Sequence, residues 1–371
     1  MDRMIKILAL QALSVMITAS FSCSPGKGDG EITAGPEDRV ITDMKGNRVV
    51  VPKKLERVAL LGGPTGQIAY ILGAQERLCA VTGSIATSEL IRIFDPSIAS
   101  RPIVRTVSGS VNVEELIKSN AQLVIAGDTD GEIVRSKTGI AVAYFDDSIG
   151  DRVEAIKKEI MFYASVFEAE KRGEAYNNYL DSMIAFINER ISSIPVNKRK
   201  VIYNGYNSNH LVTLGGDTFM QERIELAGCL NAAKEIGTSS KQEGLHSGLG
   251  EVSMELVLKW NPDIIVIDMG SLEELKNDSR WASIKAVKNG EVYTQPAGAF
   301  IWDRPTAEAA VLHPLWMAMT AYPEKFRDIS FRKEIKRFYK EIFGFNLTDK
   351  HARMIEEGSF RAKIMKGAKS Q

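Results

Sequence analysis

Residues 151–194 read DRVEAIKKEIMFYASVFEAEKRGEAYNNYLDSMIAFINERISSI, and this stretch decides how the chain is organised. Apolar residues recur in it at intervals of three and four, the spacing of an amphipathic helix. No proline interrupts the pattern before Pro195. Residues 168–172 carry charges and no periodic apolar residue, so we expect one helix to end there and another to begin. A helix of about 25 residues spans about 37 Å, enough to connect two domain cores.

A motif on one side of this stretch recurs on the other side. Residues 111–125 read VNVEELIKSNAQLVI, and residues 252–266 read VSMELVLKWNPDIIV. The two segments align without a gap and share Val, Glu, Lys and Asn at matched positions. Each copy is typical of a capped helix followed by a short loop and a buried parallel strand.

Duplication of this unit predicts an α/β fold of two Rossmann-like lobes, joined by a long connecting helix, with a ligand crevice between the lobes. We expect the N-terminal lobe at residues 39–150, the connecting segment at 151–195 and the C-terminal lobe at 196–345, followed by a tail at 346–371. Loops at the carboxyl ends of parallel strands converge on such a crevice, and ligands bind there in folds of this kind.

The first 22 residues are predicted to be a signal peptide. Two basic residues precede an apolar stretch at residues 7–21, and small residues lie before Cys23. A membrane anchor is the alternative, but the stretch is short for a span and contains several polar residues. The run SFSC at residues 20–23 resembles a bacterial lipobox, although Leu usually occupies its first place. The resemblance implies a lipid on Cys23 and a flexible tether at residues 23–38.

The chain of 371 residues has an ordinary globular composition, with 44% hydrophobic and 25% charged residues. Removal of residues 1–22 takes away two basic side chains and one acidic side chain and leaves 45 basic against 46 acidic. This near-neutral balance gives no electrostatic reason to expect nucleic-acid binding. Cys79 and Cys229 lie in apolar contexts in separate halves, so free buried thiols are expected, with a disulfide as the alternative. No CxxC or HExxH pattern is present, and we expect neither a metal site nor a cofactor.

Several short motifs, taken in order, resemble those of the class III (cluster A-2) substrate-binding proteins of ABC importers. The resemblance covers about residues 39–345 and rests on DMKGNRVVVP (43–52), ERV (56–58), ILGA (71–74), NPDIIV (261–266), WDRP (302–305), WMA (316–318) and YPE (322–324). The chain departs from the family pattern at residues 120–122, where NAQ replaces the expected Pro-Asp. The resembled family serves ferric siderophores, haem, cobalamin and some oxyanions.

The resemblance implies an exported, lipid-anchored monomer in the periplasm or at the cell surface, which captures a small ligand and delivers it to an ABC permease dimer. A ferric siderophore is the first expectation for the ligand, with a corrinoid, haem, molybdate or tungstate as alternatives. An exported hydrolase or chelatase on the same scaffold is the rival class. The chain has no GxSxG nucleophile elbow, and the adjacent His246 and Ser247 are poorly placed to form a base and nucleophile pair. We therefore expect no enzyme activity.

Polar and aromatic residues gather after the predicted strands, where the crevice is expected. The residues that we expect to face the ligand are Pro64, Thr65, Ser84 and Asp128 from the N-terminal lobe and Tyr206, Asn207, Met269, Trp302 and Arg304 from the C-terminal lobe. Trp302 is suited to stack on a flat chelate, and Arg304 to pair with an anionic group. The alternative for Trp302 is interlobe packing, and those for Arg304 are capping of its own loop or a pair near Asp303.

Glu114 and Glu255, the matched glutamates of the repeat, are expected to be exposed on the ligand-side face, one in each lobe. In the resembled family such a pair docks onto arginines of the permease dimer. The alternative is that both are first-turn carboxylates, stabilised by about 0.3–1 kcal/mol at the positive end of a helix dipole. The two roles are compatible, because the dipole contribution does not require burial.

Overall fold

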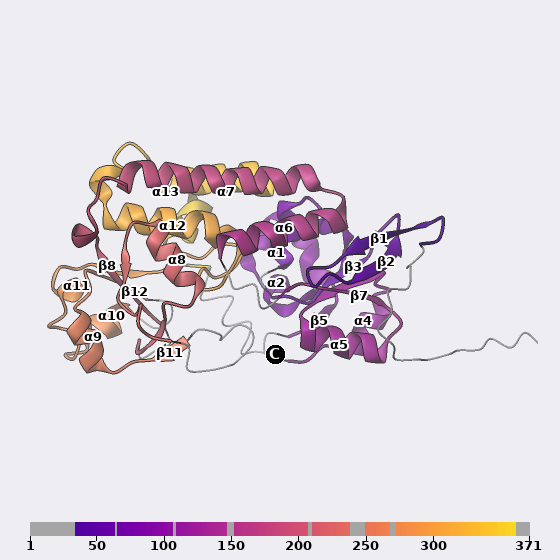
Figure 1. Cartoon of the computed structure of the whole chain (residues 1–371), viewed down its shortest axis with the longest axis horizontal. Helices are drawn as coiled ribbons and strands as arrows, with labels where there is room; N and C mark the ends of the chain where they lie inside the picture. Colours follow the sequence, from indigo (N-terminus) through magenta and orange to yellow (C-terminus); the bar gives the residue numbers. More distant parts are fainter. Residues whose placement is uncertain are drawn as a thin grey trace, which may run out of the picture. The chain divides into compact units, whose positions relative to one another are not determined.

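The computed structural model describes residues 34–63, 65–106, 109–146, 152–206, 210–237, 249–267 and 272–360 (Figure 1). The predicted signal peptide and the predicted lipidation site Cys23 lie outside the described residues, as do three of the predicted ligand residues, Pro64, Asn207 and Met269. From Ala34 onward the chain forms one compact unit.

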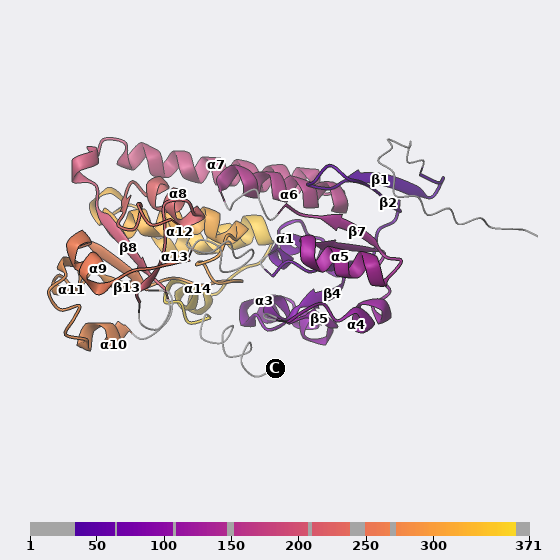
Figure 2. The ribbon, with the colours of Figure 1, turned by 60° about the horizontal axis from the view of Figure 1, so that its bottom comes forward.

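The N-terminal half is built on a parallel sheet of five strands, in the order β5-β4-β3-β6-β7. Its strands are β3 (Val58–Leu60), β4 (Leu78–Thr82), β5 (Ile103–Arg105), β6 (Leu123–Ala126) and β7 (Ala141–Tyr144). Its helices are α1 (Gly66–Ile71), α2 (Gly83–Ala86), α3 (Glu89–Phe94), α4 (Val113–Lys118) and α5 (Asp128–Lys137), with 3₁₀ turns at Gln75–Arg77 and Pro96–Ser100. The strands are apolar because helices cover the sheet, and Figure 2 shows α5 beside β7.

An antiparallel hairpin with Gly46 in its turn precedes this sheet. β1 (Asp38–Thr42) pairs with β2 (Arg48–Pro52), and Ile41 lies opposite Val49. Gly46 has a φ of 82°, a left-handed conformation that costs glycine little.

The connecting segment consists of two helices, as the break at residues 168–172 predicts. α6 (Val153–Phe167) ends at Glu168, whose φ of 53° is left-handed, and α7 (Glu170–Ile191) begins two residues later. Figure 1 shows α7 beside α12 (Ala307–Ala321). The hydroxyl of Tyr176 in α7 donates to the carbonyl of Ala307 at 2.7 Å, which fixes the start of α12 against the connection.

The C-terminal half is built on a parallel sheet of four strands, in the order β10-β8-β12-β13. Its strands are β8 (Val201–Gly205), β10 (Leu230–Asn231), β12 (Ile264–Ile267) and β13 (Val292–Thr294), and β9 (Val212–Leu214) forms a small antiparallel pair with β11 (Leu249–Glu251). Its helices, besides α12, are α8 (Phe219–Leu226), α9 (Met254–Trp260), α10 (Leu272–Asn277), α11 (Lys285–Lys288), α13 (Phe331–Phe338) and α14 (Asp349–Glu356), with 3₁₀ turns at Val196–Lys198 and Pro323–Lys325 and a π turn at Tyr339–Phe343. The predicted fold class, two α/β lobes joined by a helical connection, is confirmed.

The repeated motif occupies the same place in both sheets. α4 and β6 form its first copy, α9 and β12 form its second, and β6 lies beside β3 as β12 lies beside β8. Asn112 and Ser253 cap the two helices, each accepting a hydrogen bond from the backbone N–H three residues later, at 3.1 and 3.2 Å. Asn120 and Asn261 follow the helices with φ of 49° and 43°, a left-handed conformation that asparagine tolerates. Backbone geometry therefore explains why the matched residue is Asn.

The end of the chain packs against the N-terminal half. The ring centroid of Phe94 in α3 lies 4.7 Å from that of Phe345. Arg172 in α7 donates to the carbonyl of Ile71 at 2.8 Å and to that of Ile342 at 2.9 Å, so one side chain joins α1 to the C-terminal segment. A continuous apolar cluster runs through both halves and their helical connection.

Part of the predicted tail at residues 346–371 is folded. α14 packs on α13, and Ala352, Ile355 and Phe360 are fully buried. Phe331 and Ile335, which are four residues apart and so share one face of α13, are buried as well. This basic helix therefore exposes only its opposite face.

Candidate functional site

The loop between β3 and α1 lies at the carboxyl end of a central strand. Thr65 Oγ1 donates to the carbonyl of Gly62 at 2.9 Å, and Ser84 Oγ in α2 donates to the carbonyl of Gly63 at 3.2 Å. Both hydroxyl side chains are buried. A Cβ on Gly62 would lie 2.5 Å from Thr65 Oγ1, so the loop has no room for a larger residue there. The structure thus brings Thr65 and Ser84 to the same loop, each through a hydrogen bond to one of its carbonyls, and their contact with a ligand stays a prediction.

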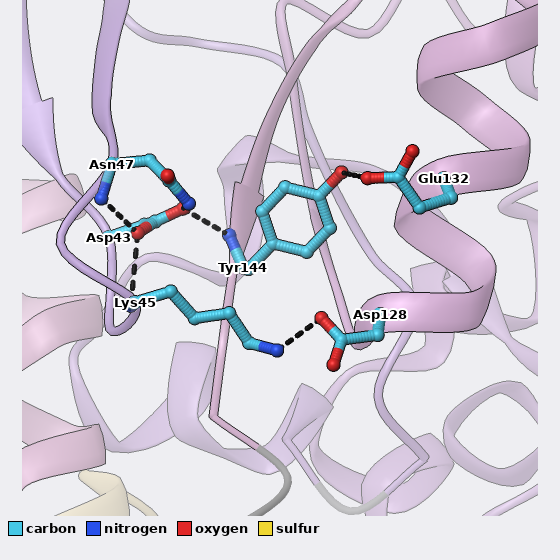
Figure 3. Close-up of polar contacts among 6 residues, drawn as sticks. All are labelled: Asp43, Lys45, Asn47, Asp128, Glu132 and Tyr144. Carbon is cyan, nitrogen blue, oxygen red and sulfur yellow. Dashed lines mark hydrogen bonds and ion pairs between the residues drawn. The ribbon is translucent and has the colours of Figure 1, made fainter. Parts of the chain in front are cut away.

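Asp128 begins α5 and forms an ion pair with Lys45 of the β1–β2 turn (Figure 3). Buried Asp43 holds that turn in place by accepting hydrogen bonds from the backbone N–H groups of Lys45, Asn47 and Tyr144, at 3.0, 2.8 and 3.0 Å. The side chain of Asp128 is 58% exposed. The hairpin therefore reaches the carboxyl ends of β6 and β7, and the predicted ligand residue Asp128 is already paired with a cation there.

Tyr206 and Arg304 meet at the corresponding end of the C-terminal sheet. Tyr206 follows β8, and its backbone N–H donates to the carbonyl of Val212 at 2.6 Å. The guanidinium carbon of Arg304 lies 5.1 Å from the ring centroid of Tyr206, within the range of a cation–π contact. Arg304 Nη1 also lies 3.2 Å from Asp303 Oδ2 and donates to the Asp303 carbonyl at 2.9 Å. The pair with Asp303, one alternative for Arg304, is therefore present, and it fixes the plane of the guanidinium.

Trp302 is fully buried and presents no ring face to a ligand in this structure. Its ring centroid lies 5.9 Å from that of His313 in α12 and 6.2 Å, edge-on, from that of Phe331 in α13. The ring therefore packs against α12 and α13 in this structure, and its contact with a ligand stays a prediction. The loop is rich in aromatic and charged residues, but its composition does not tell which of them turn inward.

Arg223 in α8 is a buried residue that sequence reasoning missed. It donates from Nη1 to the carbonyl of Trp302 at 2.8 Å and from Nη2 to the carbonyl of Arg304 at 3.0 Å. Its guanidinium carbon lies 4.6 Å from the ring centroid of Phe219, one helical turn earlier. A planar fork suits two carbonyls of one loop, so Arg223 positions the loop that carries Arg304. No local sequence signal marks this role, because the loop is distant in the chain.

A buried carboxyl lies beneath the same loop. Glu308, in the first turn of α12, accepts hydrogen bonds from the hydroxyl of Tyr339 and from the backbone N–H of Phe300. Its own N–H donates to Gln67 Oε1 of α1 at 3.3 Å, which connects the two lobes. Burial raises the pKa of Glu308 to about 7, because removing the carboxylate from water penalises its charged form. A Cβ at Gly298 would lie 1.8 Å from Glu308 Oε1, so this site tolerates only glycine there.

Glu308 is expected to make the protein less stable as the pH rises from about 5 to 7. The unfolded chain loses this proton near the ordinary pKa of 4.5, whereas the folded protein keeps it until about 7. In that window the unfolded state binds fewer protons, so the free energy of unfolding falls as the pH rises, by on the order of 3 kcal/mol. Glu308→Gln should remove this fall, as measured by urea unfolding at pH 5, 6, 7 and 8.

Glu56→Gln, at an exposed glutamate, is the matched control. A Glu308→Gln profile that parallels the unaltered protein would show that another group produces the slope.

Glu114 and Glu255 occupy the same position in the first turns of α4 and α9, and both are exposed. Glu114 Oε1 lies 3.0 Å from Nζ of Lys118, one turn later. The pKa of Glu255 is lowered, first by its own backbone N–H and then by the hydroxyl of Ser253. Both glutamates thus lie in the first turn of their helices, and permease docking stays a prediction for both residues.

A hollow of ≈ 500 Å³ opens elsewhere on the N-terminal half. Its lining residues precede β3 and β4 or follow α6: Lys53, Lys54, Leu55, Glu56, Glu76, Arg77 and Glu168. Ligands of open α/β sheets bind at the carboxyl ends of strands, and this hollow lies at the amino ends. We therefore do not assign it to the ligand.

Three further observations concern the part of the chain that the structure describes. None of the described helices has both the length and the apolar character of a membrane span. The described residues contain no cluster of three or more His, Cys, Asp or Glu side chains arranged to hold a metal. Cys79 is half-buried and Cys229 buried, and both are free thiols.

The sequence pattern of the periplasmic binding protein family matches residues 58–299. The chain is 24% identical over 332 residues to the molybdate-binding protein MolA of Haemophilus influenzae, across 82% of this chain and 91% of that protein. It is 22% identical to the putative ABC transporter substrate-binding lipoprotein YhfQ of Bacillus subtilis, across 79% of this chain and 90% of that protein.

Among solved structures, a periplasmic solute binding protein from Veillonella parvula superimposes with a TM-score of 0.73 at 25% identity, covering 88% of this chain and 98% of that one. The matched family consists of transport binding proteins that act outside the cytoplasm. The family pattern spans the sheets of both lobes and the helices that join them. The chain therefore belongs to the periplasmic binding protein family and is a class III substrate-binding protein of an ABC transporter.

Proposed function

We propose that this protein captures a small oxyanion of the molybdate type and delivers it to the permease of an ABC importer. The observation that carries the proposal is the buried Arg304 at the carboxyl end of the C-terminal sheet, held in a fixed plane by Tyr206 and Asp303. A guanidinium carries its N–H donors in a planar fork that suits two oxygens of one anion. The named ligand of the Haemophilus relative supports this class of ligand.

The ferric siderophore, first among the expectations from sequence, fits the described residues less well. A siderophore, haem or corrinoid needs a wide cleft with aromatic walls. Trp302 was the residue expected to supply such a wall, and its ring is enclosed between α12 and α13. We therefore propose an oxyanion as the ligand. The ferric siderophores, haem and cobalamin are the alternative ligands in the binding test.

We also propose that Cys23 carries a lipid and that residues 23–38 tether the protein to the membrane as a monomer. The lipobox-like run at residues 20–23 and the lipoprotein name of the Bacillus relative support the anchor. We propose lobe boundaries at residues 39–150 and 196–345, on either side of the connection at 151–195, with the packed segment at 346–360 added to the C-terminal lobe. Proteolysis of the purified protein, followed by mass spectrometry of the fragments, tests these boundaries.

Arg304→Ala is expected to weaken oxyanion binding by about 10- to 100-fold, because hydrogen bonds to charged groups contribute about 1.5–3 kcal/mol. Arg304→Lys should retain part of the affinity, since it keeps the charge and loses the fork. Isothermal titration with molybdate, a ferric hydroxamate, a ferric catecholate, cobalamin and haem measures both the ligand class and the loss. Arg135→Ala, at an exposed arginine of α5, is the matched control.

Micromolar or tighter binding of molybdate alone supports the oxyanion. Binding of a ferric siderophore at that strength, without molybdate, would overturn it. Normal oxyanion binding by Arg304→Ala would remove Arg304 from the site.

A further inference from the structure

Large apolar side chains are exposed at three positions in the part of the chain that the structure describes: Ile117 at 51%, Val196 at 64% and Leu258 at 39%. Single exposed hydrophobic residues are common on protein surfaces and need no explanation. Ile117 and Leu258, however, are matched positions of the internal repeat, one in α4 and one in α9. Two of the three exposed positions therefore form an equivalent pair, which random exposure does not explain.

Each of these apolar side chains shares a helix face with a glutamate. Ile117 comes three residues after Glu114, and Leu258 comes three residues after Glu255, a spacing that places side chains next to each other on a helix. Both glutamates are exposed as well. The two lobes therefore display the same surface unit, a carboxylate beside an aliphatic side chain.

The helices beneath this unit are held firmly in place. Leu116 of α4 and Val257 of α9, again matched positions, are fully buried against their sheets. Asn112 and Ser253 cap the helix starts. Neither exposed side chain is needed to attach its helix, so the exposure of Ile117 and Leu258 is not a by-product of loose packing.

We propose that Ile117 and Leu258 are the apolar anchors by which the protein docks on its permease, a partner that presents one basic, apolar-lined pocket twice. A partner built from two identical subunits offers such a pair of pockets, because its symmetry repeats each surface. Each pocket would receive one aliphatic side chain, with basic groups facing the adjacent Glu114 or Glu255. The proposal rests on the function proposed above, and it adds the residues that bury apolar area in the complex.

Serine at either position is expected to weaken docking about tenfold, and serine at both positions about a hundredfold, because each change withdraws one buried aliphatic side chain. The measurement is binding of the fluorescently labelled, ligand-loaded protein to the organism's own permease–ATPase complex in nanodiscs, together with the ATPase stimulation. Val196→Ser is the matched control, since Val196 is more exposed than either residue and lies outside the repeat. Ile117→Leu and Leu258→Ile should restore docking.

The serine variants should bind ligand and unfold in urea as the unaltered protein does. Docking by the double serine variant at full strength would overturn the proposal, as would a loss confined to one lobe, which contradicts a twofold partner. Failure of the unaltered protein both to bind any titrated ligand and to stimulate the ATPase overturns the proposed function and the anchors with it. Failure of the docking proposal and failure of the proposed function thus give different results.

Discussion

Replacing Glu114 and Glu255 together by alanine is expected to abolish ligand uptake and to leave ligand affinity unchanged. Both carboxylates are exposed, and that of Glu114 is 79% exposed, so their removal leaves no cavity. Loss of a first-turn carboxylate costs about 0.3–1 kcal/mol of helix stabilisation, too little to unfold a domain. The proposed docking on the permease, by contrast, would lose both charged contacts at once. Uptake by cells and isothermal titration of the purified variant measure the two effects separately.

Asp349→Ala serves as the control, because Asp349 is a 90% exposed first-turn carboxylate of α14 outside the repeat. It should leave uptake unchanged. Weaker ligand binding or a large loss of stability in the double variant would contradict a docking role for Glu114 and Glu255.

Trp302→Ala is expected to lower the free energy of unfolding by about 3–5 kcal/mol, the usual cost of truncating a buried Trp to alanine. The ring is fully buried between His313 and Phe331, and its loss leaves a cavity between α12 and α13. Trp302→Phe should retain most of the stability and the full ligand affinity. Urea unfolding and titration of both variants test this.

Trp260→Ala provides a comparison. Trp260 in α9 is only partly buried, so its replacement should lower the free energy of unfolding less. A stable Trp302→Ala variant that has lost ligand binding would restore the stacking role expected from the sequence.

Much of the fold is predictable because the spacing of apolar residues within a short segment indicates its secondary structure. The break between α6 and α7 coincides with the charged residues 168–172, where Glu168 adopts a left-handed conformation. The repeat predicted equivalent helix–strand units, and its shared Asn turned out to be a left-handed residue after each helix. Both features depend on residues that are neighbours in the sequence, so the sequence alone was enough to predict where the helices end.

The candidate site was less predictable, because loop composition does not determine the direction of side chains. Trp302 and Arg304 are adjacent on one loop, yet one packs into the lobe core and the other lies over Tyr206. Arg223 and Glu308 act on this loop from helices, through contacts that only the folded chain creates. Asp128 follows β6, but its partner Lys45 comes from a distant hairpin turn, and its contact with a ligand stays a prediction.

The packing of Phe345 on Phe94 has a consequence for the order of events as the chain is made. The N-terminal lobe is synthesised first, but the segment that covers α3 is among the last described residues. Contacts between such distant parts of a chain slow folding, and the uncovered apolar surface is prone to association in the meantime. The segment that contains Phe345 must therefore be available before the first lobe reaches its final packing.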